Sequence, residues 1–441
     1  MMIMNPLRIK DNSLTAKEQF ADISVLTKKI CDKTLEQLER EGIFVFPELV
    51  KDSDDLTKDQ MILQSVNDSY RSSNVMGFLG CGNERLTITS RFASQENDHF
   101  FQYMLEKVLD FPNIIDLETH ADHYNKLFQL LMFLFPYYLK QALRKGLFKT
   151  YIKKQYNDSN VRGVIDISRH ISKNTPFIGN IAYNQREYSY DNYLTELLRH
   201  TIEFIKKKKY GAQLLVKVKE EVQMIIDATQ KYELYDRRKV IADNNRNIIS
   251  HAYYREYRAL QNLCLLILRN QEHNIGSGSR KIYGVLFDGA WLWEEYVNTL
   301  LKDTFYHPMN KNSKGAQRLF GGNIGIIYPD FISRDTQKRI IADAKYKPFH
   351  NISGDDYLQL LAYMLRFDAK TGYYLYPDNT DVSDTKMWLN SGTTYEKNVV
   401  PRDDICVVKH GLKIPSNAMD YKAFSEKMEM NETAFKSIFI E

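Results

Sequence analysis

The spacing of hydrophobic and polar positions changes along the chain, and the changes predict three regions. The first region, residues 1–115, mixes two spacings. A short apolar run at 42–50 predicts a strand, and two extended runs separated by a turn at 80–83 predict a hairpin over 75–92. Apolar positions at helical spacing then predict a helix over 99–111. We therefore expect a mixed α/β domain at the N-terminus.

The second region, residues 116–275, has mainly helical spacing. Apolar residues recur at i, i+3 and i+4 in 192–209 and in 254–270, which predicts two amphipathic helices. The most apolar run, 127–139, is too short to span a bilayer and contains Pro136. Because proline lacks an N–H donor and disrupts a helix interior, we expect a buried helical segment that is interrupted near this residue.

The third region, residues 276–441, follows a flexible stretch at 275–280 that predicts a domain boundary. Its helical and extended spacings alternate. They predict helices at 289–305 and 355–367, a hairpin at 328–347, and strands at 372–377 and 404–414. Helices that flank a mixed sheet define an α/β domain. We therefore expect an α/β chain, or more fully an α+β multidomain protein, with a mixed N-terminal domain, a helical middle and a C-terminal sheet domain.

Composition excludes several classes of protein. Hydrophobic residues make up 43% of the chain, which is enough for globular packing and excludes wholesale disorder. The formal net charge of +4 is small for 441 residues and does not by itself indicate a nucleic-acid binder. The four cysteines are scattered without a C-x-x-C pair, so we expect neither a zinc site nor a disulfide framework. We expect no signal peptide, and these features together favour a cytoplasmic protein.

Candidate chemistry is concentrated in the hairpin YPDFISRDTQKRIIADAKYK, residues 328–347. Side chains alternate faces along a strand, so Asp343 and Lys345 share one face. The turn brings Asp330 beside Asp343, and two adjacent carboxylates repel each other unless a cation lies between them. Such oxygen ligands suit Mg²⁺, so the hairpin favours metal-assisted hydrolysis of a phosphodiester. The alternative is a surface hairpin with ordinary ion pairs, because Asp-x-Lys also occurs elsewhere in the chain.

Two helices carry polar residues that are placed to meet this hairpin. Helical spacing puts Glu294 on an apolar edge with Trp291 and Val297, where a carboxylate needs a partner. The alternative is a solvated helix carboxylate. In the later helix, Gln359 and Tyr363 are i, i+4 neighbours that are placed to meet the carboxylates or a DNA backbone. The alternative there is an ordinary polar helix face.

A polar insertion at 161–174 interrupts the helical middle region and is rich in basic side chains. Such side chains are candidates for contacts with DNA phosphates, although ion pairs within the helical packing are the alternative. The candidate DNA contacts are Arg162, Arg169, Lys173 and, in the hairpin, Lys347.

Taken in order, Glu294, the YPD of 328–330, the DAK of 343–345 and the Gln359-x-x-x-Tyr363 pair resemble the PD-(D/E)xK nuclease superfamily and its RecB-like members. The resemblance is closer to McrC, the nuclease subunit of McrBC restriction systems, and to its relatives in LlaJI-type systems. FDGAWLWEEYV is similar to a family helix, and VRGVIDISRHISKN and REYSYDNYLTELL resemble the family's middle region. The resemblance covers about 120–380 well and is weaker towards both ends.

The resemblance implies a role for each of these residues. Asp330, Asp343 and Glu294 would bind the metal, which would be Mg²⁺ or Mn²⁺, and Lys345 would be the catalytic lysine. Gln359 and Tyr363 would support them. The chain departs from the family at Trp293, where Phe is usual, and at Tyr328, where Arg is common. The second departure bears on a DNA contact.

The resemblance also implies partners. These are double-stranded DNA and a McrB-like AAA+ GTPase or NTPase motor, in a ring expected to be hexameric, in a prokaryotic cytoplasm without a membrane. The nuclease domain would be 276–441, and 1–115 would contact the motor. The chain has no G-x-x-x-x-G-K-[ST], so we expect it to bind no nucleotide itself. Two alternatives stay open: a non-catalytic activator of an NTPase ring that keeps a relic nuclease fold, and a RecB-like exonuclease.

Overall fold

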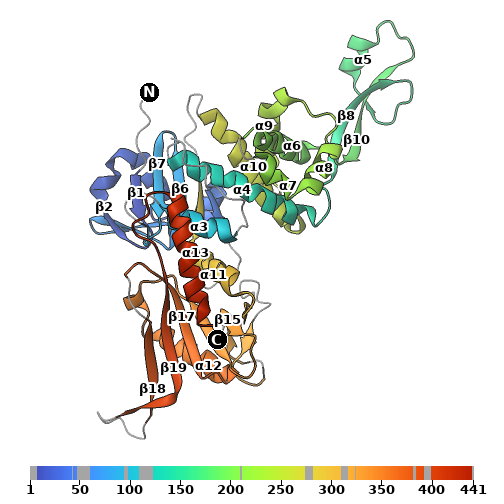
Figure 1. The fold of residues 1–441 in the computed structure, drawn as a ribbon. Coiled ribbons are helices and arrows are strands. Elements are labelled where there is room, and N and C mark those ends of the chain that lie inside the picture. Colours follow the sequence, from blue (N-terminus) through green and yellow to red (C-terminus); the bar gives the residue numbers. More distant parts are fainter. Residues whose placement is uncertain are drawn as a thin grey trace. The chain divides into compact units, whose positions relative to one another are not determined.

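The computed structural model describes most of the chain, in segments that pack into two compact units. The described residues are 7–41, 43–46, 60–93, 98–108, 123–208, 211–273, 282–308, 316–322, 324–380, 384–391 and 399–439. The first unit joins Met1–Leu127 with Gly278–Glu441, and the second is Phe128–Ser277 (Figure 1). The predicted boundary at 275–280 lies outside the described residues, and the three predicted domain ranges remain a prediction.

A five-stranded sheet lies in the N-terminal part of the first unit. Its order is β1 (Leu7–Lys10), β7 (Glu84–Thr89), β6 (Val75–Cys81), β11 (Ile282–Asp288) and β3 (Ile43–Phe46). The predicted strand and the predicted 75–92 hairpin are confirmed as β3 and the antiparallel pair β6–β7. β11 follows the middle region in sequence, yet it pairs antiparallel with β6 and parallel with β3. The sheet is therefore completed by a strand from far along the chain.

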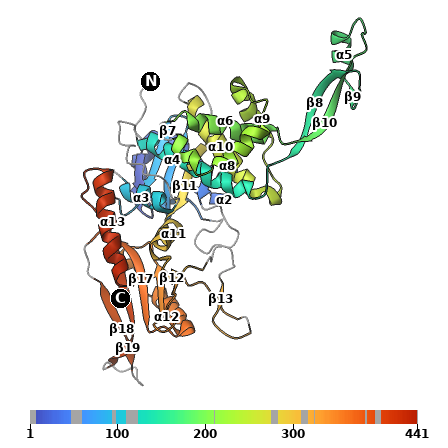
Figure 2. The ribbon, with the colours of Figure 1, turned by 45° about the vertical axis from the view of Figure 1, so that its right-hand side comes forward.

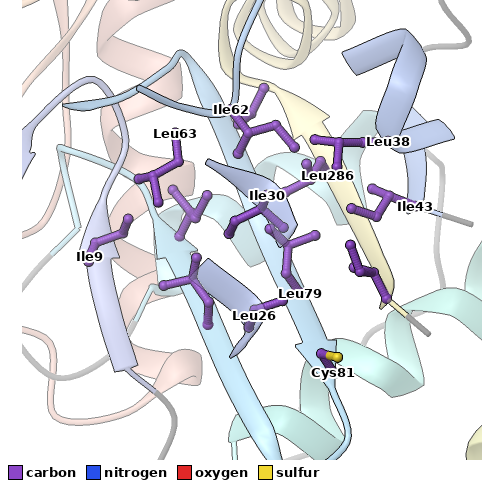
Figure 3. Packing of buried hydrophobic residues seen from close by; sticks show 14 of the residues in the cluster. Ile9, Leu26, Ile30, Leu38, Ile43, Ile62, Leu63, Leu79, Cys81 and Leu286 are labelled. Carbon is purple, nitrogen blue, oxygen red and sulfur yellow. The ribbon is translucent and has the colours of Figure 1, made fainter. Parts of the chain in front are cut away.

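Apolar side chains on one face of this sheet pack against helices α1 (Ser24–Ile30) and α2 (Leu35–Glu41) (Figure 3). Ile30 of α1, Leu38 of α2, and Leu79 and Leu286 of the strands are all fully buried. Burial of one such side chain contributes about 1.5–3 kcal/mol. Further elements of this part are a 3₁₀ helix at Lys17–Ile23 and a small sheet of β2 (Leu14–Ala16), β5 (Ser69–Ser72) and β4 (Leu63–Val66).

The C-terminal part of the first unit is built on a mixed six-stranded sheet. Its order is β12 (Phe305–Tyr306), β15 (Phe331–Ser333), β16 (Ile340–Ala344), β17 (Thr371–Asp378), β19 (Val400–Lys413) and β18 (Thr385–Ser391). β16, β17 and β19 run parallel, and the other pairs are antiparallel. The predicted hairpin is confirmed as β15–β16, and the strand predictions are confirmed as β17 and β19. A short pair, β13 (Gln317–Arg318) and β14 (Ile326–Ile327), precedes β15.

Helices flank this sheet, as the sequence predicts. α12 (Asp355–Phe367) packs on β16 and β17, and α13 (Tyr421–Ser437) packs on β19 (Figures 1 and 2). α11 (Gly289–Leu301) contacts β16, α13 and α3 (His99–Val108). The helix predicted over 99–111 is confirmed as α3. A 3₁₀ helix spans Phe349–Asn351. The mixed α/β class is therefore confirmed.

One buried carboxylate joins three of these helices. The hydroxyls of Tyr103 on α3 and Tyr296 on α11 donate hydrogen bonds of 2.9 and 2.6 Å to Oε1 of Glu432 on α13. Glu432 is 5% exposed, so its desolvation is offset by these two donors. The contact fixes α11, the helix that carries Glu294, against its neighbours.

The second unit is mainly helical. Its helices are α4 (His123–Leu143, which begins just before the unit), α6 (Tyr193–Lys206), α7 (Gly211–Val216), α8 (Lys219–Ala228), α9 (Arg237–Arg246) and α10 (Arg255–His273), with 3₁₀ turns at Leu234–Asp236 and Ala252–Tyr254. α6 and α10 confirm the two predicted amphipathic helices. α6 starts at a capping box, because the Asn192 side chain accepts from the backbone N–H of Thr195 and the Thr195 hydroxyl accepts from that of Asn192.

The polar insertion forms the end of a β-ribbon that the sequence analysis missed. β8 (Thr150–Asp158) and β10 (Ile181–Ser189) pair antiparallel over nine residues each, and β9 (Val164–Ile165) adds to β10. α5 (Ile167–Lys173) packs on β10, and Figures 1 and 2 show it at the far end of the ribbon. β8 alternates half-buried and exposed side chains, the period-2 pattern of a strand.

The predicted interruption near Pro136 is wrong, because α4 runs through this residue. Proline removes one backbone hydrogen bond from a helix interior. Phe135 before Pro136 and Leu139 after it are fully buried, and their packing offsets that loss. Among the described residues, no helix is both long enough and apolar enough to cross a membrane.

Candidate active site

The hairpin places its two aspartates as neighbours. Phe331 on β15 faces Ala342 on β16, so the next position of the antiparallel register sets Asp330 opposite Asp343. Oδ2 of Asp330 accepts a hydrogen bond of 2.8 Å from the backbone N–H of Ala344, which holds this carboxylate against β16. Asp343 is 2% exposed. Two carboxylates therefore share a desolvated corner of the sheet.

Lys345 lies on the face of Asp343, as strand alternation predicts. Its Nζ is 2.8 Å from Oδ2 of Asp343 and donates to Oε1 of Gln359 over 3.1 Å. Its backbone N–H donates to the carbonyl of Leu375 on β17 over 2.9 Å. The amine is therefore held between β16 and α12 next to the carboxylate pair.

The polar pair on α12 faces the hairpin. Nε2 of Gln359 donates to the hydroxyl of Tyr363 over 2.8 Å, while Oε1 of the same side chain accepts from Lys345. Tyr363 is 4% exposed, and its pKa is raised by burial and by the charge of Asp343. The chain of contacts Lys345–Gln359–Tyr363 makes this helix face part of the site, as the i, i+4 spacing suggested.

Glu294 lies on the buried side of α11. Its relative exposure is 9%, which excludes the solvated carboxylate that the sequence left open. α11 begins where Asp288 accepts a hydrogen bond of 2.6 Å from the backbone N–H of Trp291. The indole N–H of Trp293, the departure from the family pattern, donates to Leu375 over 3.0 Å and ties α11 to β17.

The charges of these groups act on one another. Burial raises the pKa of Asp330 well above its ordinary value, and the charges of Glu294 and Asp343 raise it further. Burial lowers the pKa of Lys345, but the charges of Asp343 and Asp330 outweigh this and raise it overall. The carboxylates of Glu294, Asp330 and Asp343 therefore repel one another where little water screens them, and a bound cation would stabilise their charged forms.

The donor atoms of three site residues are of the kind that a hard divalent cation binds. The donors of Glu294, Asp330 and Asp343 are all oxygens, the ligands that Mg²⁺ and Mn²⁺ take in proteins. The pKa of Asp330 is raised first by burial and then by the charges of Glu294 and Asp343, a setting that favours a bound cation. Over the part of the chain that the structure describes, no three His, Cys, Asp or Glu side chains are already grouped tightly enough to hold a metal ion.

Two residues at the site were missed by the sequence analysis. His307 stands 3.7 Å from both Glu294 and Glu295 through Nε2, and its Nδ1 lies 2.9 Å from the carbonyl oxygen of Asp330. No local pattern signals this, because His307 comes directly after the two-residue strand β12 and meets α11 only through the fold. Asp356 lies 3.6 Å from Nζ of Lys345, and its i, i+3 relation to Gln359 on α12 would have indicated it.

The candidate DNA contacts have different surroundings. Nζ of Lys347 is bound to both oxygens of Asp356, at 3.0 and 3.1 Å. The guanidinium of Arg169 donates to the carbonyls of Tyr156 and Tyr183, so it ties α5 to the ribbon. Arg162 and Lys173 are exposed in the second unit. A role of these residues in binding DNA stays a prediction.

The sequence between residues 70 and 377 matches the family described as the McrBC 5-methylcytosine restriction system component. The match covers more than half of the chain and includes every candidate residue of the hairpin and of the two helices. The protein therefore belongs to the McrBC family of restriction system components, and the predicted membership is confirmed. No curated protein matches the chain significantly.

Two solved structures with weak similarity come from Thermococcus gammatolerans. One is the refined half-complex from a tetradecameric assembly of McrB AAA+ hexamers with bound McrC; the match has 13% identity, covers 97% of this chain and 100% of that chain, and has a TM-score of 0.45. The other is a cryo-EM structure of the McrBC complex, with 13% identity, coverage of 68% and 87%, and a TM-score of 0.30. Both TM-scores are below 0.5, so the family assignment rests on the sequence match.

Proposed function

We propose that this chain is the McrC-type nuclease subunit of a restriction complex and that it hydrolyses DNA phosphodiesters in the manner of PD-(D/E)xK enzymes. The observation that carries the proposal is that Lys345 lies 2.8 Å from the buried Asp343 and 3.1 Å from Gln359, with Asp330 opposite Asp343. A relic fold has no reason to keep an acid pair, a lysine and their support together.

Each residue has a distinct part in the proposed reaction. Asp330, Asp343 and Glu294 would hold Mg²⁺ or Mn²⁺, which when bound would supply Lewis acidity to the phosphate and to the attacking water. Lys345 orients that water or stabilises the charge that develops on the phosphate. Gln359 holds the Lys345 amine, and Tyr363 holds Gln359. The hydrogen bond from Ala344 orients the Asp330 carboxylate.

We further propose a motor partner. The family is that of McrBC restriction components, and the Thermococcus assembly contains McrB AAA+ hexamers with bound McrC. This chain contains no phosphate-binding P-loop, so any nucleotide-driven movement along double-stranded DNA would come from a McrB-like AAA+ GTPase or NTPase ring. Recognition of the DNA site would then lie on that partner.

The test is cleavage of circular double-stranded DNA with the motor partner, nucleotide and Mg²⁺. Asp343→Asn and Lys345→Ala are expected to lower the rate by about 100-fold or more, because each removes a group that acts on the reacting phosphate. Omission of the divalent cation, with EDTA present, is expected to abolish cleavage. Cleavage of the closed circle distinguishes an endonuclease from an exonuclease that needs DNA ends.

The chain contains a matched control. Lys370 follows Asp368-Ala369, the same tripeptide, but the side chains of Lys370 and Asp368 are 59% and 97% exposed and 4.0 Å apart. Lys370→Ala is expected to cut like the wild type. If Asp343→Asn and Lys345→Ala also cut like the wild type, the site assignment is wrong. If no form of the protein cuts but all stimulate the nucleotide turnover of the motor, the chain is a non-catalytic activator.

A further inference from the structure

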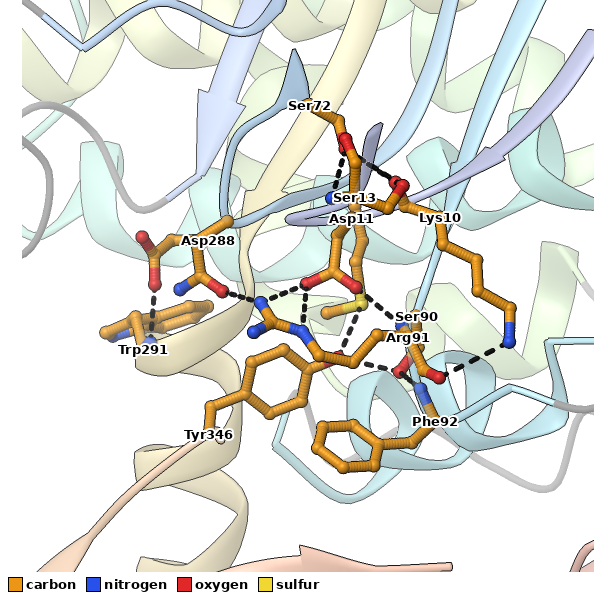
Figure 4. A network of polar contacts seen from close by, with 12 residues as sticks. Lys10, Asp11, Ser13, Ser72, Ser90, Arg91, Phe92, Asp288, Trp291 and Tyr346 are labelled. Carbon is orange, nitrogen blue, oxygen red and sulfur yellow. Dashed lines mark hydrogen bonds and ion pairs between the residues drawn. The ribbon is translucent and has the colours of Figure 1, made fainter. Parts of the chain in front are cut away.

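The residue after Lys345 is anchored in a different part of the first unit. Tyr346 points to the opposite side of the strand from Lys345 and is 4% exposed. Its hydroxyl is 2.6 Å from Oγ of Ser90, which lies just after β7 of the N-terminal sheet. The Arg91 guanidinium lies over its ring, 4.8 Å from the centroid, and the Phe92 ring meets it edge-on at 5.1 Å (Figure 4).

Arg91 is itself held rigidly. Its Nε and Nη2 donate to Oδ2 of Asp11 over 3.0 and 2.6 Å, and its backbone N–H donates to Oδ1 of Asp11 over 2.5 Å. Nη2 also donates to the side-chain carbonyl of Asn74. The Asp11 side chain is fully buried, and that of Arg91 is 12% exposed. Because these hydrogen bonds to Asp11 restrain the Arg91 side chain, its guanidinium is held in place against one face of the Tyr346 ring.

Asn74, which accepts from Arg91, also holds the start of α11. The backbone N–H of Gly289 donates to the carbonyl of Asn74 over 2.9 Å. A Cβ at Gly289 would lie 2.7 Å from the Tyr346 ring, so only glycine allows this close approach. The start of the helix that carries Glu294 therefore packs against Tyr346, the residue after Lys345. Asn74 holds the helix start and Arg91 contacts the Tyr346 ring.

We propose that Arg91, held by Asp11, is a positioning residue of the nuclease: it clamps Tyr346 and so sets the backbone of Lys345 relative to Glu294. This inference rests on the proposed function. Arg91 touches neither the metal ligands nor the lysine amine, and it acts only through the strand. Its effect is expected on the rate of the chemical step, because a misplacement of about 1 Å in a catalytic group can cost about 100-fold.

Three variants test the clamp. Arg91→Ala removes the guanidinium that lies over the Tyr346 ring, but it leaves the Asp11 carboxylate buried without this cation, which can unfold the protein. The double variant Asp11→Asn with Arg91→Gln removes both charges of this pair and keeps side chains of similar size. For each folded variant, kcat for DNA cleavage is expected to fall about 10-fold or more with KM for DNA unchanged. Arg91→Lys, which keeps the charge without the planar fork, is expected to recover part of kcat.

A second measurement does not depend on DNA cleavage. Reductive methylation of lysines, followed by mass spectrometry, reports how tightly the Lys345 amine is held by Asp343 and Gln359. The methylation rate of Lys345 is expected to rise several-fold in the clamp variants, while that of the exposed Lys370 stays unchanged. An unchanged Lys345 rate together with an unchanged kcat in a folded variant would overturn the inference. If wild type cuts no DNA under any condition, the proposed function fails, and the methylation rates alone decide whether the clamp positions Lys345.

Discussion

At the residue scale, burial distinguishes two copies of the same tripeptide. The side chains of Asp343 and Lys345 are 3% and 16% exposed and 2.8 Å apart, whereas those of Asp368 and Lys370 are 97% and 59% exposed. Water screens the second pair, so its contribution is small. In the first pair, low exposure strengthens the interaction and leaves the amine directed at the carboxylates. The chemistry of the tripeptide therefore depends on where the fold places it.

Gln359 provides a residue-scale prediction. Gln359→Leu removes the oxygen that accepts from Lys345 and the N–H that donates to Tyr363. The Lys345 amine therefore loses one of the hydrogen bonds that position it. We expect DNA cleavage to slow by about 10-fold or more, because a loosely held catalytic group spends less time in the reactive geometry. The measurement is the single-turnover cleavage rate.

The preceding residue is the control for this variant. Leu358 lies on the same helix and is 69% exposed, and the contacts to Lys345 and Tyr363 come from Gln359, so Leu358→Ala is expected to cut at the wild-type rate. A Gln359→Leu variant that also cuts at this rate would show that Lys345 does not need its hydrogen bond to Gln359.

At the element scale, some helices and strands are predicted by their local pattern and others are not. α12 spans Asp355–Phe367, the range that its spacing predicted, because one apolar face is enough to define it. β8 and β10 were missed inside a region of helical spacing, although β8 alternates along its whole length and β10 alternates over 185–189. β18 and α13 were also not predicted, and both lie against β19.

The helix α6 gives a prediction about pH. Burial lowers the pKa of His200 from 6.5 to about 4, with the charge of Arg237 adding to this. Between pH 4 and pH 6.5 the unfolded chain therefore binds a proton that the folded chain does not, so stability falls as the pH falls. From pH 7 to pH 5 this one group is expected to remove about 2 kcal/mol from the free energy of unfolding.

Denaturant titrations at both pH values, followed by circular dichroism, check this expectation. His200→Gln is expected to lose about 2 kcal/mol less than wild type between pH 7 and pH 5. The control is His350→Gln, which makes the same substitution at an exposed histidine. Equal pH dependence of wild type and His200→Gln would contradict a neutral buried imidazole.

At the scale of the whole molecule, the first unit joins both ends of the chain. β11 lies between β6 and β3, and its Val285 and Leu286 are buried there. Tyr346, which follows Lys345, is buried against Ser90 and Met76. The C-terminal sheet therefore depends on the N-terminal sheet for the packing of the elements that carry its candidate residues.

Deletion of residues 1–115 tests this dependence. The remaining chain would expose the pairing edges of β11 and the Tyr346 ring, so we expect loss of cooperative unfolding and aggregation of the C-terminal part. The comparison is a chain in which 128–277 is replaced by a flexible linker, because it keeps the whole first unit. Thermal unfolding of the two forms measures the difference. A cooperative transition in the first form would show that the N-terminal sheet is dispensable.

The sequence alone determined the elements with a strong local period and the residues on their faces. It predicted the Asp330–Asp343 hairpin, the shared face of Lys345, and the Gln359–Tyr363 pair, because strand alternation and helical i, i+4 spacing are properties of neighbouring residues. The tertiary structure decided what depends on contacts between distant residues. These are the pairing of β11 with β3 and β6, the approach of His307 and Asp356 to the site, and the clamp of Arg91 on Tyr346. Such contacts follow from which surfaces bury each other, and no local pattern encodes that.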